Sequence, residues 1–100
     1  GVAKAALEMS VKYLSVDLGS NNIRVNAISA GPMRTIAGAA IAKAREVYKY
    51  TEKNSPLHRN VNLDELGNTA LYFVSDLSKA VSGEIHYVDC GFNIIGMPQN

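Results

Sequence analysis

A short run of residues that follows an apolar stretch has the chemistry best suited to binding a ligand. Residues 23–29 have the length of a β-strand and mostly alternate apolar and polar side chains, and Ala30, Gly31 and Pro32 follow at once. In open α/β sheets, ligands bind beyond the carboxyl ends of the strands. Glycine lets a ligand approach the backbone, proline stiffens the exit, and the hydroxyl of Thr35 can donate or accept a hydrogen bond. Such a turn could hold a planar amide or a phosphate, although a plain turn that leads into a surface helix has the same pattern.

Three stretches of the sequence predict helices around this turn. Residues 2–18 place apolar side chains at spacings of four and seven, and Gly19 is a natural helix end. Residues 37–53 are rich in alanine, and residues 63–75 form a third helix that Asn62 could cap. These helices would flank the strand that carries the turn.

Helices and strands alternate along the chain. Residues 84–89 predict a second strand, which follows a turn at Ser82 and Gly83. The order helix, strand, helix, helix, strand predicts an α/β fold with a parallel sheet covered on both faces. Two strands are too few for such a sheet, so we expect residues 1–100 to be the C-terminal portion of a doubly wound domain that exposes large apolar faces when it stands alone.

Composition and charge exclude several classes of function. The chain has 100 residues, of which 47% are hydrophobic and 19% charged, as in an ordinary globular protein. The net charge of +1 comes from dispersed residues, which disfavours binding to nucleic acid or to a membrane surface. No apolar run reaches the roughly 18–20 residues that span a bilayer. The single cysteine, Cys90, excludes an internal disulfide and a zinc site made of several cysteines, and it fits a reducing cytosol.

The segment around the turn resembles a known family. Asn-Ala-Ile-Ser at residues 26–29, followed by Gly31, Pro32 and Thr35, is similar to the Val-Asn-x-Ile-x-Pro-Gly-x-x-x-Thr segment of the short-chain dehydrogenases. Most members have Pro-Gly, whereas this chain has Ala-Gly-Pro-Met-Arg-Thr at residues 30–35. That version is characteristic of the enoyl-acyl-carrier-protein reductases in this superfamily.

Further stretches agree with the same family in the same order. Residues 1–8 resemble the segment around its active-site lysine, and residues 64–78 resemble a helix and the loop after it. Residues 82–92 resemble its last strand, with Cys90 in place of the usual glycine. The resemblance covers nearly the whole chain and implies a Rossmann-like doubly wound fold, of which this is the C-terminal part.

The resemblance assigns a catalytic role to Lys4. In the family, the matching lysine hydrogen-bonds the ribose hydroxyls next to nicotinamide, and its charge stabilises an enolate as it develops. Without the resemblance, Lys4 would be interpreted as a surface lysine. The family's catalytic tyrosine lies seven residues before this lysine, so we expect it upstream of Gly1, together with the phosphate-binding loop. No tyrosine of the chain matches that position.

The resemblance also assigns residues to cofactor and substrate. The backbone of Met33 is expected to hold the nicotinamide carboxamide, and Thr35 to reach the carboxamide or the pyrophosphate. The substrate-binding loop is expected over about residues 36–54, where Ala37 and Ile41 would contact the acyl chain, although an ordinary amphipathic helix could begin there instead. The cofactor-binding residues implied are Lys4, Gly31, Pro32, Met33, Arg34, Thr35, Ile36 and Ala37.

The implied function is reduction of the trans-2 double bond of an enoyl thioester on acyl carrier protein, with NADH, in bacterial type II fatty acid synthesis. A cytoplasmic homotetramer without a metal is expected. Another short-chain dehydrogenase, such as a ketoacyl reductase, and a non-catalytic dinucleotide-binding protein remain the alternatives. The choice between NADH and NADPH depends on residues upstream of this sequence.

Other polar residues of the chain are given structural roles. His58 lies in a loop and is expected to be solvated, and His86 to pack or face solvent in its strand. Cys90 is interpreted as a small packed residue. Asp64 and Glu65 are interpreted as favourable charges at a helix start.

Overall fold

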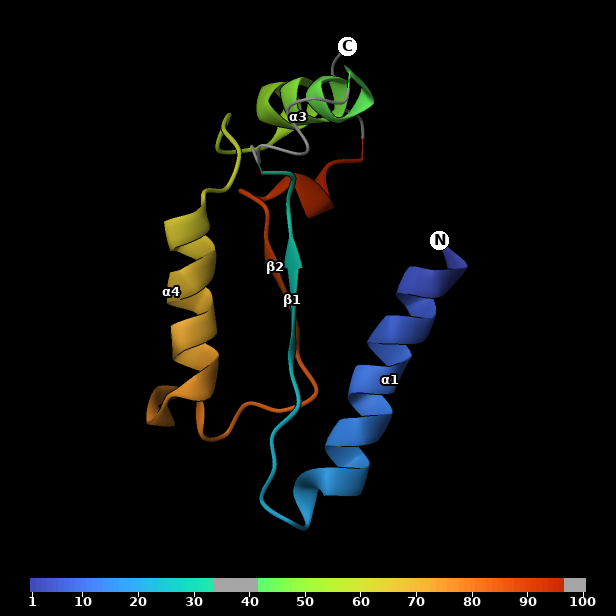
Figure 1. Ribbon diagram of the computed structural model, residues 1–100, viewed down its shortest axis with the longest axis vertical. Coiled ribbons are helices and arrows are strands. Elements are labelled where there is room, and N and C mark those ends of the chain that lie inside the picture. Colours follow the sequence, from blue (N-terminus) through green and yellow to red (C-terminus); the bar gives the residue numbers. More distant parts are fainter. Residues whose placement is uncertain (34–41, 97–100) are drawn as a thin grey trace. The chain divides into compact units, whose positions relative to one another are not determined.

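The computed structural model describes residues 1–33 and 42–96. These residues form two compact units, unit 1 from residues 1–29 and 69–86, and unit 2 from residues 30–68 and the chain from residue 87 onward. In chain order the elements are α1 (Val2–Gly19), β1 (Ala27–Ala30), α3 (Ala42–Asn54), α4 (Leu63–Val74), the short 3-10 helix η1 (Asp76–Ser78), β2 (Ile85–Val88) and the short 3-10 helix η2 (Phe92–Ile94) (Figure 1).

The two strands pair side by side in one sheet (Figure 1). The amide of Ala27 donates to the carbonyl of Glu84 at 2.9 Å, and the amide of Gly31 donates to that of Val88 at 3.0 Å. From the first hydrogen bond to the second, the donor moves four residues towards the C-terminus and the acceptor does the same, so the strands are parallel. The α/β class with parallel strands that the sequence predicts is therefore confirmed. Because the strands are parallel, Ala30 and Val88 end them at the same edge of the sheet.

The first strand is shorter than the sequence pattern predicts. Residues 23–26 do not belong to β1, and the strand continues to Ala30, one residue beyond the predicted end. In this segment the amide of Gly83 donates to the Val25 carbonyl at 2.7 Å, and side chains make further contacts in place of a regular ladder. The amide of Val25 donates to the Ser82 hydroxyl at 3.2 Å, and the Asn26 side-chain amide donates to the Val81 carbonyl at 3.0 Å. An alternating pattern therefore indicates extended backbone here without a complete set of strand hydrogen bonds.

The helices lie where their periodicity and capping residues place them. α1 and α4 match the predicted ranges to within about a residue. Asn62 caps α4 as expected, since its Oδ1 accepts from the amide of Glu65 at 2.9 Å and the Glu65 carboxylate accepts from the amide of Asn62 at 3.0 Å. This reciprocal pair is a capping box. α3 begins at Ala42, and the predicted helical residues 37–41 lie outside the described part of the chain.

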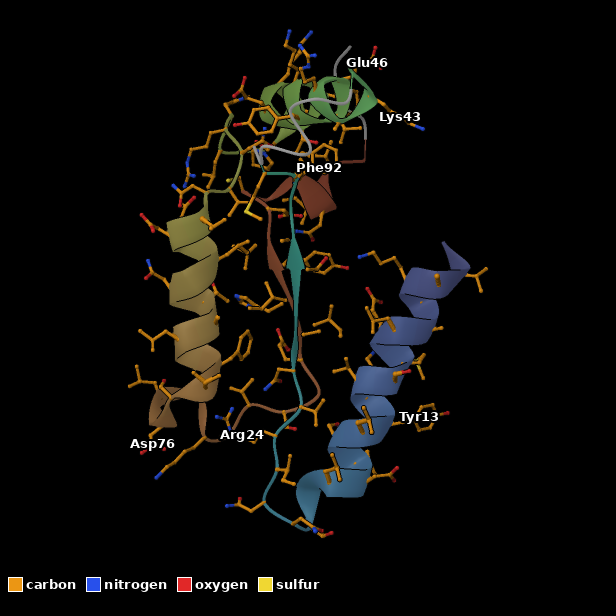
Figure 2. All side chains as sticks on the ribbon, in the orientation of Figure 1. Tyr13, Arg24, Lys43, Glu46, Asp76 and Phe92 are labelled. Atoms are coloured by element: carbon orange, nitrogen blue, oxygen red, sulfur yellow. The ribbon has the colours of Figure 1, made fainter. Side chains whose placement is uncertain are left out.

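Arg24 holds the C-terminal end of α4 within unit 1 (Figure 2). Its Nη2 donates to the carbonyl oxygens of Phe73 at 2.8 Å and Ser75 at 3.3 Å. Its Nη1 donates to the Ser78 hydroxyl at 3.0 Å and the Val81 carbonyl at 3.2 Å. The last carbonyls of a helix have no partner within the helix and carry partial negative charge, so a guanidinium suits them. Arg24 thus ties the segment before β1 to the end of α4.

The described residues bury few large apolar side chains. Those with less than a tenth of their surface exposed are Val11 and Phe73 in unit 1 and Val61 in unit 2. On α1, Val2 is 89% exposed and Val16 78% exposed. The expectation of exposed apolar faces is confirmed, because a sheet of two strands offers too little area to cover the helices. Within the described ranges, no helix has the length and apolar character to cross a membrane.

The Arg24 contacts lead to a prediction on stability. Arg24→Lys should lower the free energy of unfolding of the full-length protein by about 1–3 kcal/mol, because one ammonium cannot reach both groups of acceptors. Arg45→Lys, at an exposed position of α3, is the control and should stay within about 0.5 kcal/mol of the starting protein. Chemical denaturation measures both variants. Equal effects of the two substitutions would contradict the role given to Arg24.

Candidate functional site

The turn after β1 passes close to the residue that follows β2. Gly31, Pro32 and Met33 are half-buried, and all three belong to unit 2. A Cβ atom on Gly31 would lie 3.1 Å from the Cβ and 3.2 Å from the Cα of Asp89, and 3.7 Å from Cγ1 of Val61. Any larger residue would push these groups apart. Asp89 therefore lies against the backbone of Gly31, and the approach of a ligand that the sequence predicts at Gly31 stays a prediction.

Asp89 organises the chain beyond β2. Its Oδ1 accepts from the amide of Gly91 at 3.0 Å and from Nδ2 of Asn93 at 3.1 Å, and its Oδ2 accepts from the amide of Asn93 at 3.0 Å. The residue is only 9% exposed. A buried carboxylate must have hydrogen-bond donors, and here the following four residues supply them. The carboxylate therefore fixes the start of η2.

The next two residues have left-handed backbone conformations. The φ angle is 58° at Cys90 and 87° at Gly91. A Cβ on Gly91 would lie 2.9 Å from Cγ of Pro56, so glycine is required there by both conformation and space. The left-handed φ at Cys90 also explains why the family that the sequence resembles usually has glycine at this position. Cys90 is half-buried, and desolvation by burial raises the pKa of its thiol, which fits a packed residue and not a nucleophile.

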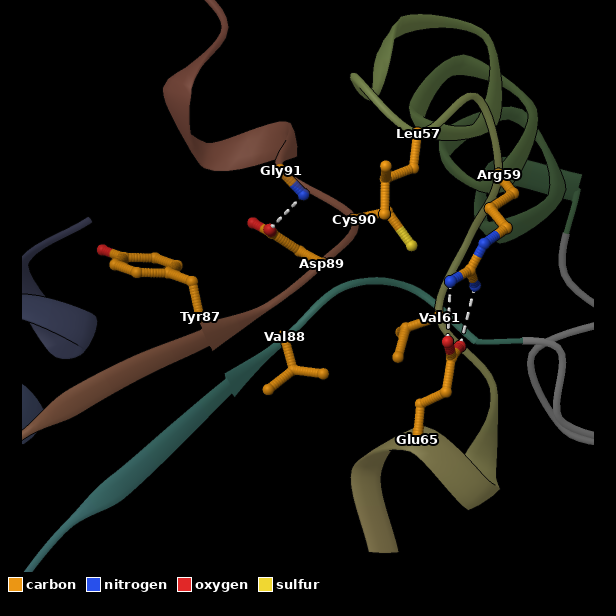
Figure 3. A pocket seen from close by; sticks show the side chains of 9 residues that line it. All are labelled: Leu57, Arg59, Val61, Glu65, Tyr87, Val88, Asp89, Cys90 and Gly91. Carbon is orange, nitrogen blue, oxygen red and sulfur yellow. Dashed lines mark hydrogen bonds and ion pairs between the residues drawn. The ribbon is translucent and has the colours of Figure 1, made fainter. Parts of the chain in front are cut away.

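A pocket of about 290 Å³ opens beside these residues (Figure 3). All the lining residues belong to unit 2. On one side the Arg59 guanidinium faces the Glu65 carboxylate, with Nη1 to Oε1 at 2.8 Å and Nη2 to Oε2 at 2.7 Å (Figure 3). The pocket is lined by Leu57, Arg59, Val61, Glu65, Tyr87, Val88, Asp89, Cys90 and Gly91.

The paired charges of Arg59 and Glu65 shift each other's titration. The hydrogen bonds from Arg59, and then the backbone hydrogen bond from Asn62, lower the pKa of Glu65 from 4.5 to about 2. The same pairing raises the pKa of Arg59. The interpretation of Glu65 as a helix-start charge is confirmed, but sequence spacing did not indicate Arg59. The two residues are six apart and lie outside the three- and four-residue spacing that marks helical pairs.

Hydrogen bonds and one ring contact join α3 to the segments around the pocket. The Asn60 side-chain amide donates to the Tyr48 carbonyl at 2.8 Å. Ser55 is fully buried, and its hydroxyl donates to the Arg59 carbonyl at 2.8 Å. The ring of Phe92, in η2, meets that of Tyr50 edge-on, with 6.1 Å between centroids. Polar contacts therefore locate the end of α3 in unit 2.

The residues that the sequence assigns to the site fall in three places. Lys4 is exposed on α1 and belongs to unit 1. Gly31, Pro32 and Met33 form the half-buried turn in unit 2. The remaining assigned residues lie outside the described part of the chain: Arg34, Thr35, Ile36, Ala37 and Ile41. Their roles stay predictions.

Both histidines have structural surroundings. His58 is exposed with a φ of 53°. His86 is also exposed, its Nδ1 lies 3.6 Å from Oε1 of Glu84, and its ring meets that of Phe73 edge-on at 5.5 Å. Within residues 1–33 and 42–96, no group of three or more His, Cys, Asp or Glu side chains could hold a metal ion. Of the described residues, the one carboxylate that lies near a histidine is Glu84, two residues before His86 on the same exposed segment, so the interpretation of His86 as a residue that packs or faces solvent stands.

Comparison with known proteins finds a family whose sequences match nearly the whole chain. Residues 1–93 match the family described as enoyl-(acyl carrier protein) reductase. The chain is 62% identical over 98 residues to enoyl-(acyl-carrier-protein) reductase (NADH) 2 of Rhizobium meliloti, a match covering 98% of the chain and 37% of the relative. It is 59% identical over 96 residues to the corresponding NADH reductase of Rickettsia typhi, covering 96% of the chain and 37% of that relative.

A solved structure agrees with these relatives. The crystal structure of the reductase from Anaplasma phagocytophilum in complex with NAD is similar with a TM-score of 0.92 and 53% identity, covering 100% of this chain and 38% of that one. The likeness confirms the predicted fold class, an α/β arrangement matching the C-terminal part of a Rossmann-like structure. The chain spans 37% of the length of the curated relatives it matches.

The lowered pKa of Glu65 leads to a prediction on pH dependence. The folded-state pKa lies below the ordinary value, so the stabilisation is present above about pH 4.5 and is lost as the pH falls towards about 2. Glu65→Gln should therefore be less stable than the starting protein at neutral pH, and this difference should narrow over that interval. Chemical denaturation of the full-length protein across the pH range measures it.

A neighbouring carboxylate is the matched control. Asp64→Asn removes an exposed acidic residue from the same helical turn, and its effect should stay within about 0.5 kcal/mol at every pH. A Glu65→Gln difference that stays constant from neutral to acidic pH would show that Glu65 contributes nothing through its charge.

Proposed function

Because this chain belongs to the enoyl-(acyl carrier protein) reductase family, we propose that its whole protein reduces the trans-2 double bond of enoyl thioesters carried on acyl carrier protein, with NADH as the hydride donor. The observation that carries the proposal is the 62% identity, over nearly all of the chain, to a relative named as an NADH reductase of this kind. The substrate and cofactor follow from that name, and type II fatty acid synthesis follows from the substrate.

Lys4 is the residue of the described chain to which we give a catalytic role. Its ammonium has three donors and stands exposed on α1, as a group that binds a ribose diol must. NADH supplies the hydride. Hydride addition to the β-carbon would place negative charge on the thioester oxygen, and a nearby cation would stabilise that charge. Lys4 thus orients the ribose and favours the enolate electrostatically.

The turn after β1 is the part of unit 2 that we assign to the nicotinamide. Gly31, Pro32 and Met33 leave the sheet at the carboxyl ends of the strands, where dinucleotides bind in folds of this class. Peptide groups in this half-buried turn can hydrogen-bond a carboxamide, and we assign that contact to Met33. Residues 34–37 extend the proposed cofactor site outside the described chain.

Substrate binding is assigned to the loop over about residues 36–54. α3 is its second part, and Ala37 and Ile41 would contact the acyl chain. We further propose that residues 1–100 belong to a single domain, that the protein assembles as a homotetramer, and that it acts in the cytoplasm. The exposed apolar side chains of α1 fit packing against further protein, either the rest of the same domain or a second subunit.

A direct assay tests the proposed reaction. The full-length protein should oxidise NADH when it is given crotonyl thioester, measured as loss of NADH absorbance. A ketoacyl thioester is the discriminating control, since the Ala-Gly-Pro sequence at residues 30–32 disfavours a ketoacyl reductase. Turnover of the ketoacyl thioester alone would assign the protein to another branch of the superfamily, and no turnover with either substrate would favour a non-catalytic binding protein.

Substitution of Lys4 tests its role separately. Lys4→Ala should raise the Kd for NADH about tenfold and lower kcat/KM about a hundredfold, because both ribose binding and charge stabilisation are lost. Lys12→Ala, an exposed lysine two turns further along α1, is the matched control and should leave both constants within about twofold. Equal kinetics for Lys4→Ala and the starting protein would refute the assignment.

A further inference from the structure

Asp89 is buried, and within residues 1–33 and 42–96 its carboxylate forms no ion pair with a basic side chain. Its three hydrogen-bond donors, from Gly91 and Asn93, are uncharged, although the residue is only 9% exposed. Burying a carboxylate costs free energy that only hydrogen bonds or a counter-charge can offset, and here hydrogen bonds from neutral donors offset it. The two carboxylate oxygens accept hydrogen bonds from the backbone amides of Gly91 and Asn93. An asparagine in this place would turn its own NH2 group, itself a donor, towards one of these amides. The charge therefore permits a turn that an amide would distort.

The backbone of Asp89 locates the turn that begins at Gly31. The missing Cβ of Gly31 would stand 3.1 Å from the Cβ of Asp89, and Gly31 also donates to the Val88 carbonyl at 3.0 Å. The backbone of Gly31 is thus held from the strand by a hydrogen bond and from Asp89 by direct contact. A movement of Asp89 towards Gly31 would displace Gly31, because even a Cβ has too little space between them.

The other side of Asp89 is fixed by the loop after α3. Figure 3 shows the carboxylate turned towards the amide of Gly91. Gly91 in turn packs on Pro56, where an added Cβ would lie 2.9 Å from Cγ, and the amide of Leu57 donates to the Cys90 carbonyl at 3.2 Å. Asp89 therefore occupies a position that two neighbouring segments of unit 2 determine.

We propose that Asp89 is a positioning residue for NADH. It acts through Gly31 and sets the position of the Gly31–Pro32–Met33 turn relative to the nicotinamide. The proposal rests on the function proposed above, because it uses that turn as the nicotinamide site. The carboxylate itself touches neither cofactor nor substrate. Its effect is geometric: it holds the residue against which Gly31 packs.

Asp89→Asn in the full-length protein is the direct test. The substitution preserves volume but replaces one accepting oxygen with a donor, so the turn should shift while the fold remains. The Kd and the KM for NADH should each rise about tenfold, as a small displacement of a binding group produces. The kcat at saturating NADH should stay within about threefold. A merely structural role would lower the melting temperature and leave the Kd for NADH unchanged at low temperature.

A matched control and a second variant keep the test decisive. Asp76→Asn removes an exposed carboxylate from η1 and should leave the Kd for NADH unchanged. If Asp89→Asn fails to fold, Asn93→Ala removes only the side-chain donor to Asp89 and should raise the Kd for NADH about two- to threefold. An unchanged Kd in folded Asp89→Asn, or in Asn93→Ala where the first variant is unfolded, overturns the proposal.

NADH binding is measured without turnover, which separates this proposal from the proposed reaction. If the starting protein binds NADH but reduces no enoyl thioester, the proposed reaction is contradicted, and the Asp89 proposal is still tested by the Kd for NADH. A protein that reduces the enoyl thioester, with equal NADH affinity in the starting protein and Asp89→Asn, would remove the Asp89 proposal alone.

Discussion

The parallel pairing of β1 and β2 is the constraint on which the candidate site depends. Parallel strands must end at the same edge of their sheet, so the residues that follow them meet there. In this chain those residues are Gly31 and Asp89, and the hydrogen bond from Gly31 to Val88 fixes their register. Because Gly31 has no Cβ, its backbone lies close to that of Asp89, where an added Cβ would stand only 3.2 Å from the Asp89 Cα. The position of the turn follows from backbone chemistry before any ligand is considered.

A second constraint acts at the opposite end of the strands, within unit 1. Arg24 satisfies carbonyls at the end of α4, and Asn26 bonds both the Val81 carbonyl and the amide of Glu84. These side-chain contacts supplement the backbone hydrogen bond from the amide of Gly83 to the Val25 carbonyl. Residues 23–26 therefore remain extended but irregular, and the regular ladder begins only at Ala27. A guanidinium with five donors can serve several carbonyls at once, which a single backbone amide cannot do.

The sequence predicted those elements of the fold that depend on interactions between residues close together along the chain. The period of α1, the Asn62 cap and the turn at Gly83, where φ is 76°, depend only on neighbouring residues, and the structure agrees with them. Asp89 and the Arg59–Glu65 pair were missed as features of the site because their importance arises from chain segments that folding brings together. An Asp-x-Gly sequence does signal a turn, but it does not reveal that Gly31 packs behind it. The role of Lys4 came from resemblance, since one exposed lysine on a helix has no distinguishing local pattern.

Directional bonds, more than apolar burial, hold the described part of unit 2. Val61 is its buried large apolar residue, whereas Thr51, Asn54, Ser55, Asn60 and Asp89 are buried polar residues. Apolar contacts tolerate changes of shape when volume is kept, but hydrogen bonds in a dry environment lose strength quickly with distance and angle. This network of hydrogen bonds therefore fixes the positions of the backbone segments in unit 2 more strongly than it contributes to the free energy of unfolding. Losing one acceptor would displace the neighbouring backbone without removing a core, because little apolar area is buried there to lose.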